Sequence, residues 1–185
     1  RLRCGCASTA RALERRQWRV WAGDELMETK LEPVESFLES GLMPRGQLVF
    51  AYGRPGFGKS FLFTVGLSLH LALGEPWFGL STQPCRVLVL AAELPAVRFQ
   101  DYARQWGLEV NARLAVLAAE SLSSPALLSD HEVVDDIVAL SLSHRADVVL
   151  IDPFSRFHMG AESPEHLAPS LVGLQRIAAL ANACV

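Results

Sequence analysis

Residues 53–60 read GRPGFGKS, directly after the apolar run LVFAY at 48–52 and before the apolar stretch FLFTVGLSLHLALG at 61–74. The eight residues match the pattern G-x-x-x-x-G-K-[ST], which requires a strand before it and a helix after it. Residues 48–52 are apolar enough for a buried strand, and 61–73 are long enough for a mostly buried helix that stops at Gly74. This context favours a phosphate-binding loop over a glycine-rich turn with a solvated lysine.

The loop has the chemistry that a nucleotide polyphosphate requires. Glycines permit unusual dihedral angles, so that consecutive backbone N–H groups surround the phosphates, and the positive end of the following helix reinforces them. Lys59 is expected to reach the β- and γ-phosphates and the Ser60 hydroxyl to ligate Mg²⁺. The predicted contacts to ATP are Gly53, Arg54, Pro55, Gly56, Phe57, Gly58, Lys59, Ser60 and Phe61.

The choice of lysine at position 59 supports this interpretation. Of 17 Lys and Arg residues only Lys30 and Lys59 are lysine, so the sequence otherwise uses arginine wherever either residue would serve. A compact ammonium among phosphates is not replaceable by a planar guanidinium.

Two acidic residues follow apolar runs and are the candidates for metal binding and catalysis. Asp152 follows DVVLI at 147–151, and we expect it to bind Mg²⁺ through water; its alternative role is to cap the next turn. Pro153 then stands where many P-loop ATPases place a catalytic glutamate. Glu93, after RVLVLAA at 86–92, is therefore the candidate that orients and deprotonates the attacking water. Its alternative role is a carboxylate at the N-terminus of the helix that Pro95 starts.

Apolar strands alternate with helices along the chain, which predicts an α/β fold with a parallel sheet covered on both faces. Ligands of such sheets bind at the carboxyl ends of the strands, where the candidate residues fall. A further strand is predicted at 114–117, and helices are predicted at 9–18, 32–40, 95–106 and near 167–177. Ser129 and Glu132 have the spacing of a capping box, which predicts another helix from there to 138.

Composition limits the classes of partner. A net charge of −3 predicts no general attraction to nucleic acid, so any DNA contact must come from a local patch or a subunit ring. The longest uncharged stretch, 61–74, is too short to span a bilayer. Cys4, Cys6, Cys85 and Cys184 form no disulfide framework, which favours free thiols in a reducing cytoplasm.

We expect a single catalytic module with an N-terminal extension. Residues 1–40 are predicted to be a partly helical arm and 41–185 the ATPase core, which we expect to be a C-terminally incomplete fragment because ANACV resembles the opening of a strand. Arg156 and His158 are candidates for contact with nucleotide, a neighbouring subunit or DNA, with loop solvation as the alternative. We expect a packing role for His70. For the aromatic residues we expect positions in the core or an interface, and not base-stacking surfaces: Trp77, Phe78, Phe99 and Trp106.

With these residues in place, the chain resembles the RepA-like branch of the RecA-type ATPases, hexameric helicases and related motors of plasmids and phages. The resemblance spans 41–185 and rests on four blocks in order: GLMPRGQLVFAYGRPGFGKS, LGEPWFG, RVLVLAAE and VVLIDPFSRFH. It implies a RecA-like fold and ATP hydrolysis in a homo-hexameric ring, with an arginine from the neighbouring subunit and with motion passed to single-stranded DNA. Residues 53–60, Glu93 and Asp152 take the family's roles position by position.

Two departures limit what the resemblance carries over. Leu94 stands where family members often have an acidic residue after the glutamate. The sensor strand, arginine finger and DNA loops would lie past Val185, so the fragment is expected to bind nucleotide and hydrolyse it poorly. A RecA-like regulatory or recombination-mediator switch is the alternative function. A small-molecule kinase is less favoured, because neither an arginine-rich lid nor an acceptor site is evident.

Overall fold

The computed structural model describes residues 20–122, 126–158 and 163–185. It divides into two units, Arg1–Pro33 and Val34–Val185. In the described part of the first unit the chain forms one short helix, α1 (Gly23–Glu28), which buries none of its residues. The helix predicted at 9–18, together with Cys4 and Cys6, lies outside the described residues.

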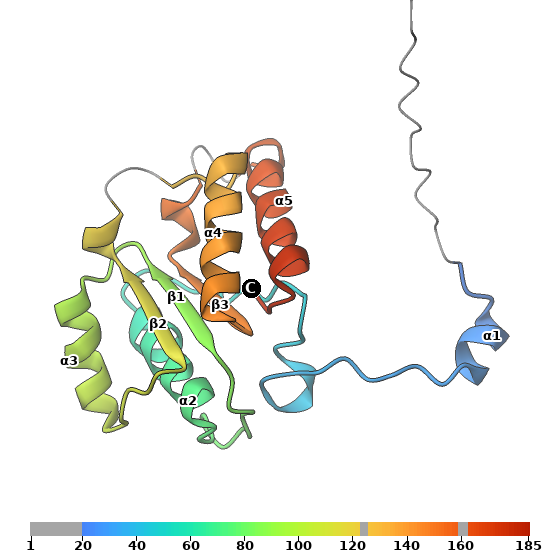
Figure 1. Cartoon of the computed structure of the whole chain (residues 1–185), viewed down its shortest axis with the longest axis horizontal. Coiled ribbons are helices and arrows are strands. Elements are labelled where there is room, and N and C mark those ends of the chain that lie inside the picture. Colours follow the sequence, from blue (N-terminus) through green and yellow to red (C-terminus); the bar gives the residue numbers. More distant parts are fainter. Residues whose placement is uncertain (1–19, 123–125, 159–162) are drawn as a thin grey trace, which may run out of the picture. The chain divides into compact units, whose positions relative to one another are not determined.

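A parallel sheet of three strands forms the centre of the second unit. The strands are β1 (Val87–Ala91), β2 (Leu114–Ala118) and β3 (Val148–Asp152), in the order β2-β1-β3 (Figure 1). Val87 lies opposite both Leu114 and Val148, so the three strands end together at their carboxyl ends. This arrangement confirms the predicted α/β fold and is consistent with a RecA-like P-loop NTPase.

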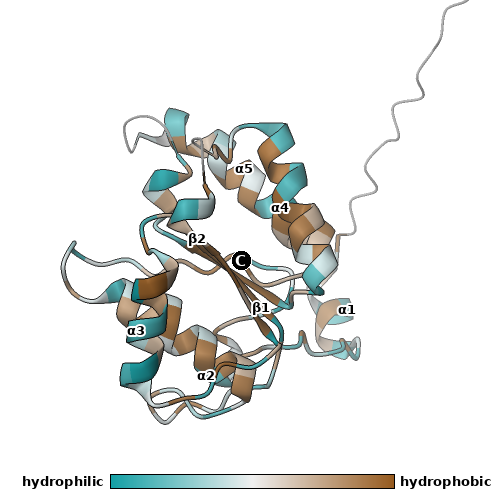
Figure 2. Ribbon diagram, turned by 60° about the vertical axis from the view of Figure 1, so that its left-hand side comes forward, coloured by the Kyte–Doolittle hydropathy of each residue, from teal (hydrophilic) through white to brown (hydrophobic). Residues whose placement is uncertain are grey.

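Alternate residues of β1 belong to two separate hydrophobic cores. Val87, Val89 and Ala91 join the core that includes residues of α2 (Ser68–Leu73) and α3 (Ala96–Trp106). Leu88 and Leu90 join the core that includes α4 (His131–His144) and α5 (Pro164–Ala181). Figure 2 shows the apolar strands between these two pairs of helices. Both faces of the strand are covered, which explains why its sequence is continuously apolar.

Three helical turns complete the described elements: η1 (Glu39–Gly41), η3 (Ala119–Ser121) and η4 (Phe154–Arg156). The helix predicted at 32–40 is wrong, because Ser36 and Leu38 instead form antiparallel bridges with Pro44 and Thr82. The predicted helix at 61–73 is present as the π-helix η2 (Ser60–Leu67) followed by α2. Asp130 rather than Ser129 caps α4, by accepting a hydrogen bond from the Glu132 amide at 2.9 Å.

The strand predicted at 48–52 is wrong, because none of these residues lies in a strand. The chain pairs with the last residue of the sequence: the Val49 amide donates to the Val185 carbonyl at 2.8 Å, and the Val185 amide donates to the Gln47 carbonyl at 2.9 Å. Cys184 in turn bridges Val148 of β3 in parallel. Beyond Val49 no described strand lies alongside, and Tyr52 is 97% exposed. A backbone without a hydrogen-bonded neighbour does not form a strand, however apolar its side chains are.

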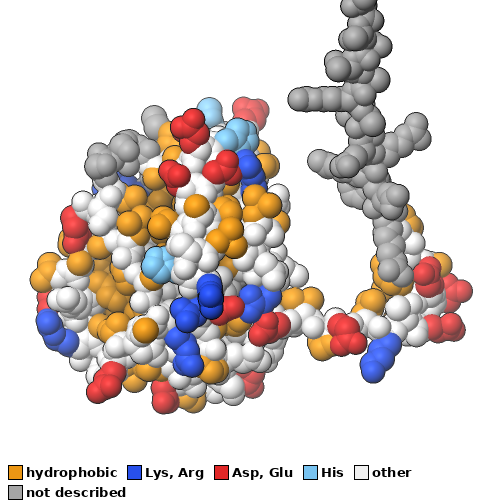
Figure 3. Space-filling model, viewed as in Figure 1, with side chains coloured by type: hydrophobic (Ala, Val, Ile, Leu, Met, Phe, Trp, Pro, Cys, Tyr) orange, Lys and Arg blue, Asp and Glu red, His pale blue; other side chains and the backbone are white. Residues whose placement is uncertain are grey.

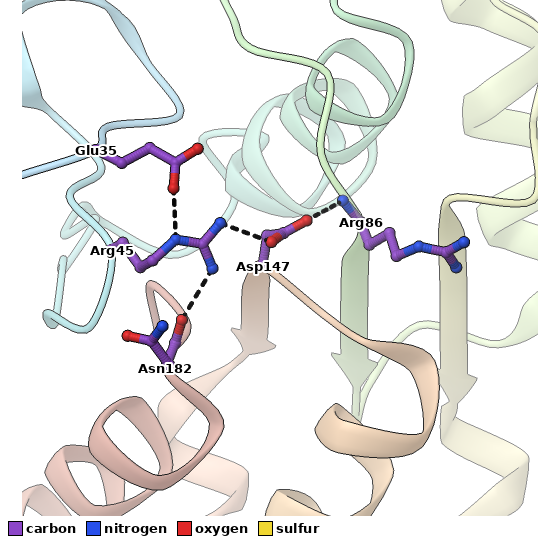
Figure 4. Close-up of polar contacts among 5 residues, drawn as sticks. All are labelled: Glu35, Arg45, Arg86, Asp147 and Asn182. Atoms are coloured by element: carbon purple, nitrogen blue, oxygen red, sulfur yellow. Dashed lines mark hydrogen bonds and ion pairs between the residues drawn. The ribbon is translucent and has the colours of Figure 1, made fainter.

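The Arg45 guanidinium forms hydrogen bonds to three other parts of the chain near the amino-terminal ends of the strands (Figure 4). Arg45 donates from Nε to Glu35 at 2.6 Å, from Nη2 to Asp147 at 2.7 Å and from Nη1 to the Asn182 carbonyl at 3.0 Å. Asp147 also accepts from the Arg86 amide at 2.9 Å. Burial opposes the charged guanidinium, but the bonds to Glu35 and Asp147 outweigh it and raise the pKa of Arg45. These hydrogen bonds join residues that lie far apart in sequence, so no local pattern predicts them.

Cys85 and Cys184 are buried free thiols in the same core. Burial, the main cause, raises the pKa of Cys85 to about 12 and that of Cys184 to about 11. Both side chains are therefore uncharged packing groups at neutral pH rather than reactive thiolates.

We expect replacement of Gly173 by Ala to destabilise the fold. A Cβ at this position of α5 would overlap the backbone carbonyl of Leu128, and no side-chain rotation relieves a backbone clash. The overpacking is expected to cost about 1–3 kcal/mol, more than alanine gains in helix propensity. Urea unfolding checks the effect. Gly23→Ala is the control, because a Cβ there meets no atom within 4 Å. If both variants unfold at the same urea concentration, the expectation is contradicted.

Candidate nucleotide-binding site

The glycine-rich loop directly precedes the helix η2, as the motif requires, but the 47–52 segment before it is not a strand. Gly56 has φ 82° and Gly58 φ 75°, in the left-handed region that favours glycine. Gly53 has no positive φ, and a Cβ there would lie 3.5 Å from the Lys59 side chain, at ordinary contact distance. The backbone therefore requires glycine at positions 56 and 58. No side chain caps the N-terminus of η2 in the described part of the chain, so its amide groups are available to an anion.

Lys59 bonds to carbonyl groups of its own loop. Its Nζ donates to the Gly53 carbonyl at 2.7 Å and to the Arg54 carbonyl at 2.9 Å. These carbonyl oxygens carry only partial negative charge, whereas phosphate oxygens carry full charge and bind an ammonium more strongly. The ammonium is thus held at the loop by contacts that a polyphosphate would outcompete.

Asp152 lies on the same cavity as Lys59. The cavity has a volume of about 470 Å³ and runs between the 49–51 segment and the end of β3, with Val185 also in its lining. The Asp152 carbonyl accepts from the Ala92 amide at 2.8 Å, which fixes the strand end. Among the described residues no donor is bonded to the Asp152 carboxylate, and η4 has no side-chain cap. The alternative role of Asp152, capping the next turn, is therefore absent from the structure.

The donor set fits Mg²⁺ held jointly with a phosphate. No group of three or more His, Cys, Asp or Glu side chains gathers within the described residues, so protein ligands alone form no metal cage there. Mg²⁺ usually keeps several waters and takes one or two protein oxygens together with phosphate oxygens. Ser60 at the start of η2 and Asp152 at the end of β3 are the two such oxygens that the sequence predicts.

Glu93 follows β1 and is half exposed. Its Oε1 accepts a hydrogen bond from Arg156 Nε at 2.7 Å. The role of a carboxylate at the N-terminus of α3 is taken by Glu120, whose two oxygens accept from the Ala96 amide at 3.0 and 3.2 Å. Glu93 is therefore not needed to cap the helix. Sequence reasoning missed Glu120, because it reaches α3 from the turn after β2 and has no local signal.

The two candidate residues in the loop after Asp152, Arg156 and His158, have different surroundings in the structure. Arg156, in η4, is exposed and pairs with Glu93. His158 is only 9% exposed, its Nδ1 lies 3.0 Å from Ser170 Oγ on α5, and its ring stacks on Phe154. His158 thus packs the loop against α5, and this burial argues against the predicted direct contact with DNA, nucleotide or another subunit.

The aromatic residues near the loop form a packed group. Phe61 stacks on Trp106 with ring centroids 5.3 Å apart, and Trp106 Nε1 donates to the Phe61 carbonyl at 3.1 Å. His70 contacts Trp106 edge-on, which agrees with its predicted packing role. Phe57 at the tip of the loop is 72% exposed and Phe78 is 68% exposed, so both rings are accessible to a ligand or partner.

One comparison with known proteins places this chain in a family. A protein-family model described as an AAA domain matches residues 9–184, almost the whole chain. No curated protein matches the chain. No helix in the described residues is long and apolar enough to cross a membrane. From the family match and the α/β fold around the loop, the chain belongs to the AAA domain family of P-loop ATPases.

Proposed function

We propose that this domain binds Mg·ATP at residues 53–61 and hydrolyses it as a RecA-type motor of the RepA-like kind, acting in plasmid or phage DNA replication. The observation that carries the proposal is the shared edge of the sheet: Lys59 and Asp152 line one cavity, and Glu93 stands at the end of the neighbouring strand without a helix to cap. Water-mediated phosphoryl transfer needs a cation on the phosphates, a metal ligand and a base, and these three residues are the groups proposed for those roles.

Each of these side chains has a distinct part in the reaction. Lys59 Nζ exchanges the Gly53 and Arg54 carbonyls for phosphate oxygens, which orients the γ-phosphate and offsets its charge. Glu93 accepts the proton of the attacking water while the bond between the γ-phosphorus and the bridging oxygen breaks. Ser60 and Asp152 would hold Mg²⁺, which when bound neutralises charge on the β- and γ-phosphate oxygens.

The proposed partners are other copies of this chain, in a homo-hexameric ring, and single-stranded DNA; the proposed location is the cytoplasm. The support for DNA is the family resemblance rather than bulk charge, since the net charge is −3. Acidic and basic side chains are interspersed on the face drawn in Figure 3. A ring that gathers basic loops at its centre would supply the local positive field that strand binding requires.

Steady-state ATP hydrolysis by the full-length protein, with and without single-stranded DNA, tests the motor proposal. A motor is expected to hydrolyse ATP several-fold faster when an oligo-dT strand is present. Lys59→Ala should abolish hydrolysis both with and without oligo-dT. The favoured alternative is a regulatory or recombination-mediator switch of the same fold. Slow hydrolysis that is indifferent to oligo-dT would contradict the motor and favour that switch.

A further inference from the structure

The indole of Trp106, the last residue of α3, contacts η2, the helix that follows the glycine-rich loop. Trp106 Nε1 donates a hydrogen bond to the Phe61 carbonyl at 3.1 Å, across 45 residues of sequence. We propose that Trp106 is a positioning residue for nucleotide binding, which holds the start of η2 in the geometry that phosphate and Mg²⁺ require. The proposal rests on the nucleotide-binding function proposed above.

The helix that Trp106 contacts has an unusual geometry. Residues Ser60–Leu67 form a π-helix, in which backbone hydrogen bonds join residues five positions apart rather than four. Turns of this kind are rare and frequently lie at functional sites. The π-helix begins at Ser60, directly after Lys59. The two side chains proposed to contact Mg²⁺ and phosphate therefore stand at its start, where a change of helical geometry would move them.

Trp106 contacts both ends of one π turn. Phe61 and Gly66 are five positions apart, which is the spacing of a π-helical hydrogen bond. The indole nitrogen bonds to the Phe61 carbonyl, and the indole ring lies so close to Gly66 that a Cβ there would overlap it. The contact therefore requires glycine at position 66, and a single side chain holds the whole turn.

The half of η2 nearest the loop is less buried than the other half. Its buried residues are 64–67, whereas 60–63 are only partly buried. The Leu62 amide donates to the Gly58 carbonyl at 2.9 Å, so a shift of the partly buried half would also move the loop. Ordering a turn when a ligand binds costs conformational entropy. A turn that Trp106 has already fixed avoids this cost and binds the ligand more tightly.

The test compares Trp106→Phe with Tyr102→Phe in isothermal titration calorimetry with Mg·ATP. Trp106→Phe keeps an aromatic ring and removes the N–H donor. A neutral hydrogen bond shifts an equilibrium by about two- to tenfold, so we expect the Kd for Mg·ATP to rise by about this factor. In the full-length protein, KM for ATP should rise with it while kcat at saturating ATP stays unchanged.

Tyr102→Phe is the matched control for the loss of a polar group from α3. The Tyr102 ring contacts the Phe61 ring edge-on, with centroids 5.2 Å apart. Within the described residues its hydroxyl forms no hydrogen bond to η2, so this variant should keep the Kd of the unchanged chain. Thermal melting of each variant without nucleotide shows whether a change in affinity reflects lost folding.

Gly66→Ala breaks the same contact from the side of η2. The added Cβ keeps the indole N–H but forces the ring away from its place beside the Phe61 carbonyl, so this variant should also weaken Mg·ATP binding. Hydrogen exchange without nucleotide gives a second measurement. The amides of 60–67 should exchange faster in Trp106→Phe and Gly66→Ala than in the unchanged chain, whereas those of β1 should not.

Two results would overturn the inference: the same Kd for Trp106→Phe as for Tyr102→Phe, or a raised Kd without faster exchange of the 60–67 amides. Failure of the proposed nucleotide site gives a different result. If Lys59→Ala weakens Mg·ATP binding and Trp106→Phe does not, the loop binds phosphate and the positioning role is wrong. If Lys59→Ala keeps the affinity, the loop does not bind phosphate and both proposals fall.

Discussion

Replacing Lys59 with Ala is expected to weaken Mg·ATP binding by at least about 30-fold. The substitution removes the ammonium that contacts the phosphates and leaves their charge uncompensated, a loss that costs about 2–5 kcal/mol where charged groups pair away from water. The Gly53 and Arg54 carbonyls, which now accept from Nζ, can accept from solvent because the loop around them is exposed. Isothermal titration calorimetry with Mg·ATP measures the change.

Lys30→Ala is the matched control for this experiment. Lys30 is the other lysine of the chain, and it lies outside the Val34–Val185 unit that holds the loop. Its loss should leave the affinity within about twofold, whereas an unchanged affinity in Lys59→Ala would refute the phosphate-binding loop. A melt without nucleotide separates lost binding from lost folding.

Glu93→Gln is expected to lower kcat by about 10²–10⁴-fold while the affinity for Mg·ATP stays nearly constant. General-base catalysis contributes a factor of this size, and a neutral amide cannot accept the proton of the attacking water. The amide oxygen can still accept from Arg156 Nε, so the loop geometry is preserved. Single-turnover hydrolysis, with binding measured in parallel, separates the two quantities.

Glu120→Gln is the control for a carboxylate at the same edge of the sheet. It accepts from the Ala96 amide at the start of α3 and takes no part in the proposed chemistry. The variant should keep kcat within about twofold. A drop in kcat as large as that of Glu93→Gln would mean that Glu93 and Glu120 have been assigned the wrong roles.

Predictions from the sequence were correct where the structure depends on neighbouring residues or on a run of residues of one type. The runs at 86–92 and 147–151 predicted β1 and β3 because strands covered on both faces are continuously apolar. The loop at 53–60 was predicted from its own residues, and the positive φ of Gly56 and Gly58 agrees with the need for glycine there. Gly74 and Gly107 end α2 and α3 in the left-handed conformation, as helix-terminating glycines do.

Predictions from the sequence failed where the hydrogen-bond or packing partner of a residue lies far away in the chain. The 48–52 run has strand composition, but pairing with Val185 extends only to Val49. The acceptor for the start of α3 is Glu120, which no spacing rule connects to Ala96. His158 looked like a loop histidine, yet Ser170 on α5 bonds its ring and packing buries it.

A structure of this chain with Mg²⁺ and a non-hydrolysable ATP analogue tests the proposed nucleotide site most directly. We expect the β- and γ-phosphates to lie against the backbone amides of 56–60 and Lys59 Nζ to have moved from the Gly53 carbonyl onto phosphate oxygens. We expect Mg²⁺ on Ser60 Oγ, with water between it and Asp152. An analogue bound elsewhere, with Lys59 still bonded to the Gly53 and Arg54 carbonyls, would contradict the proposed site.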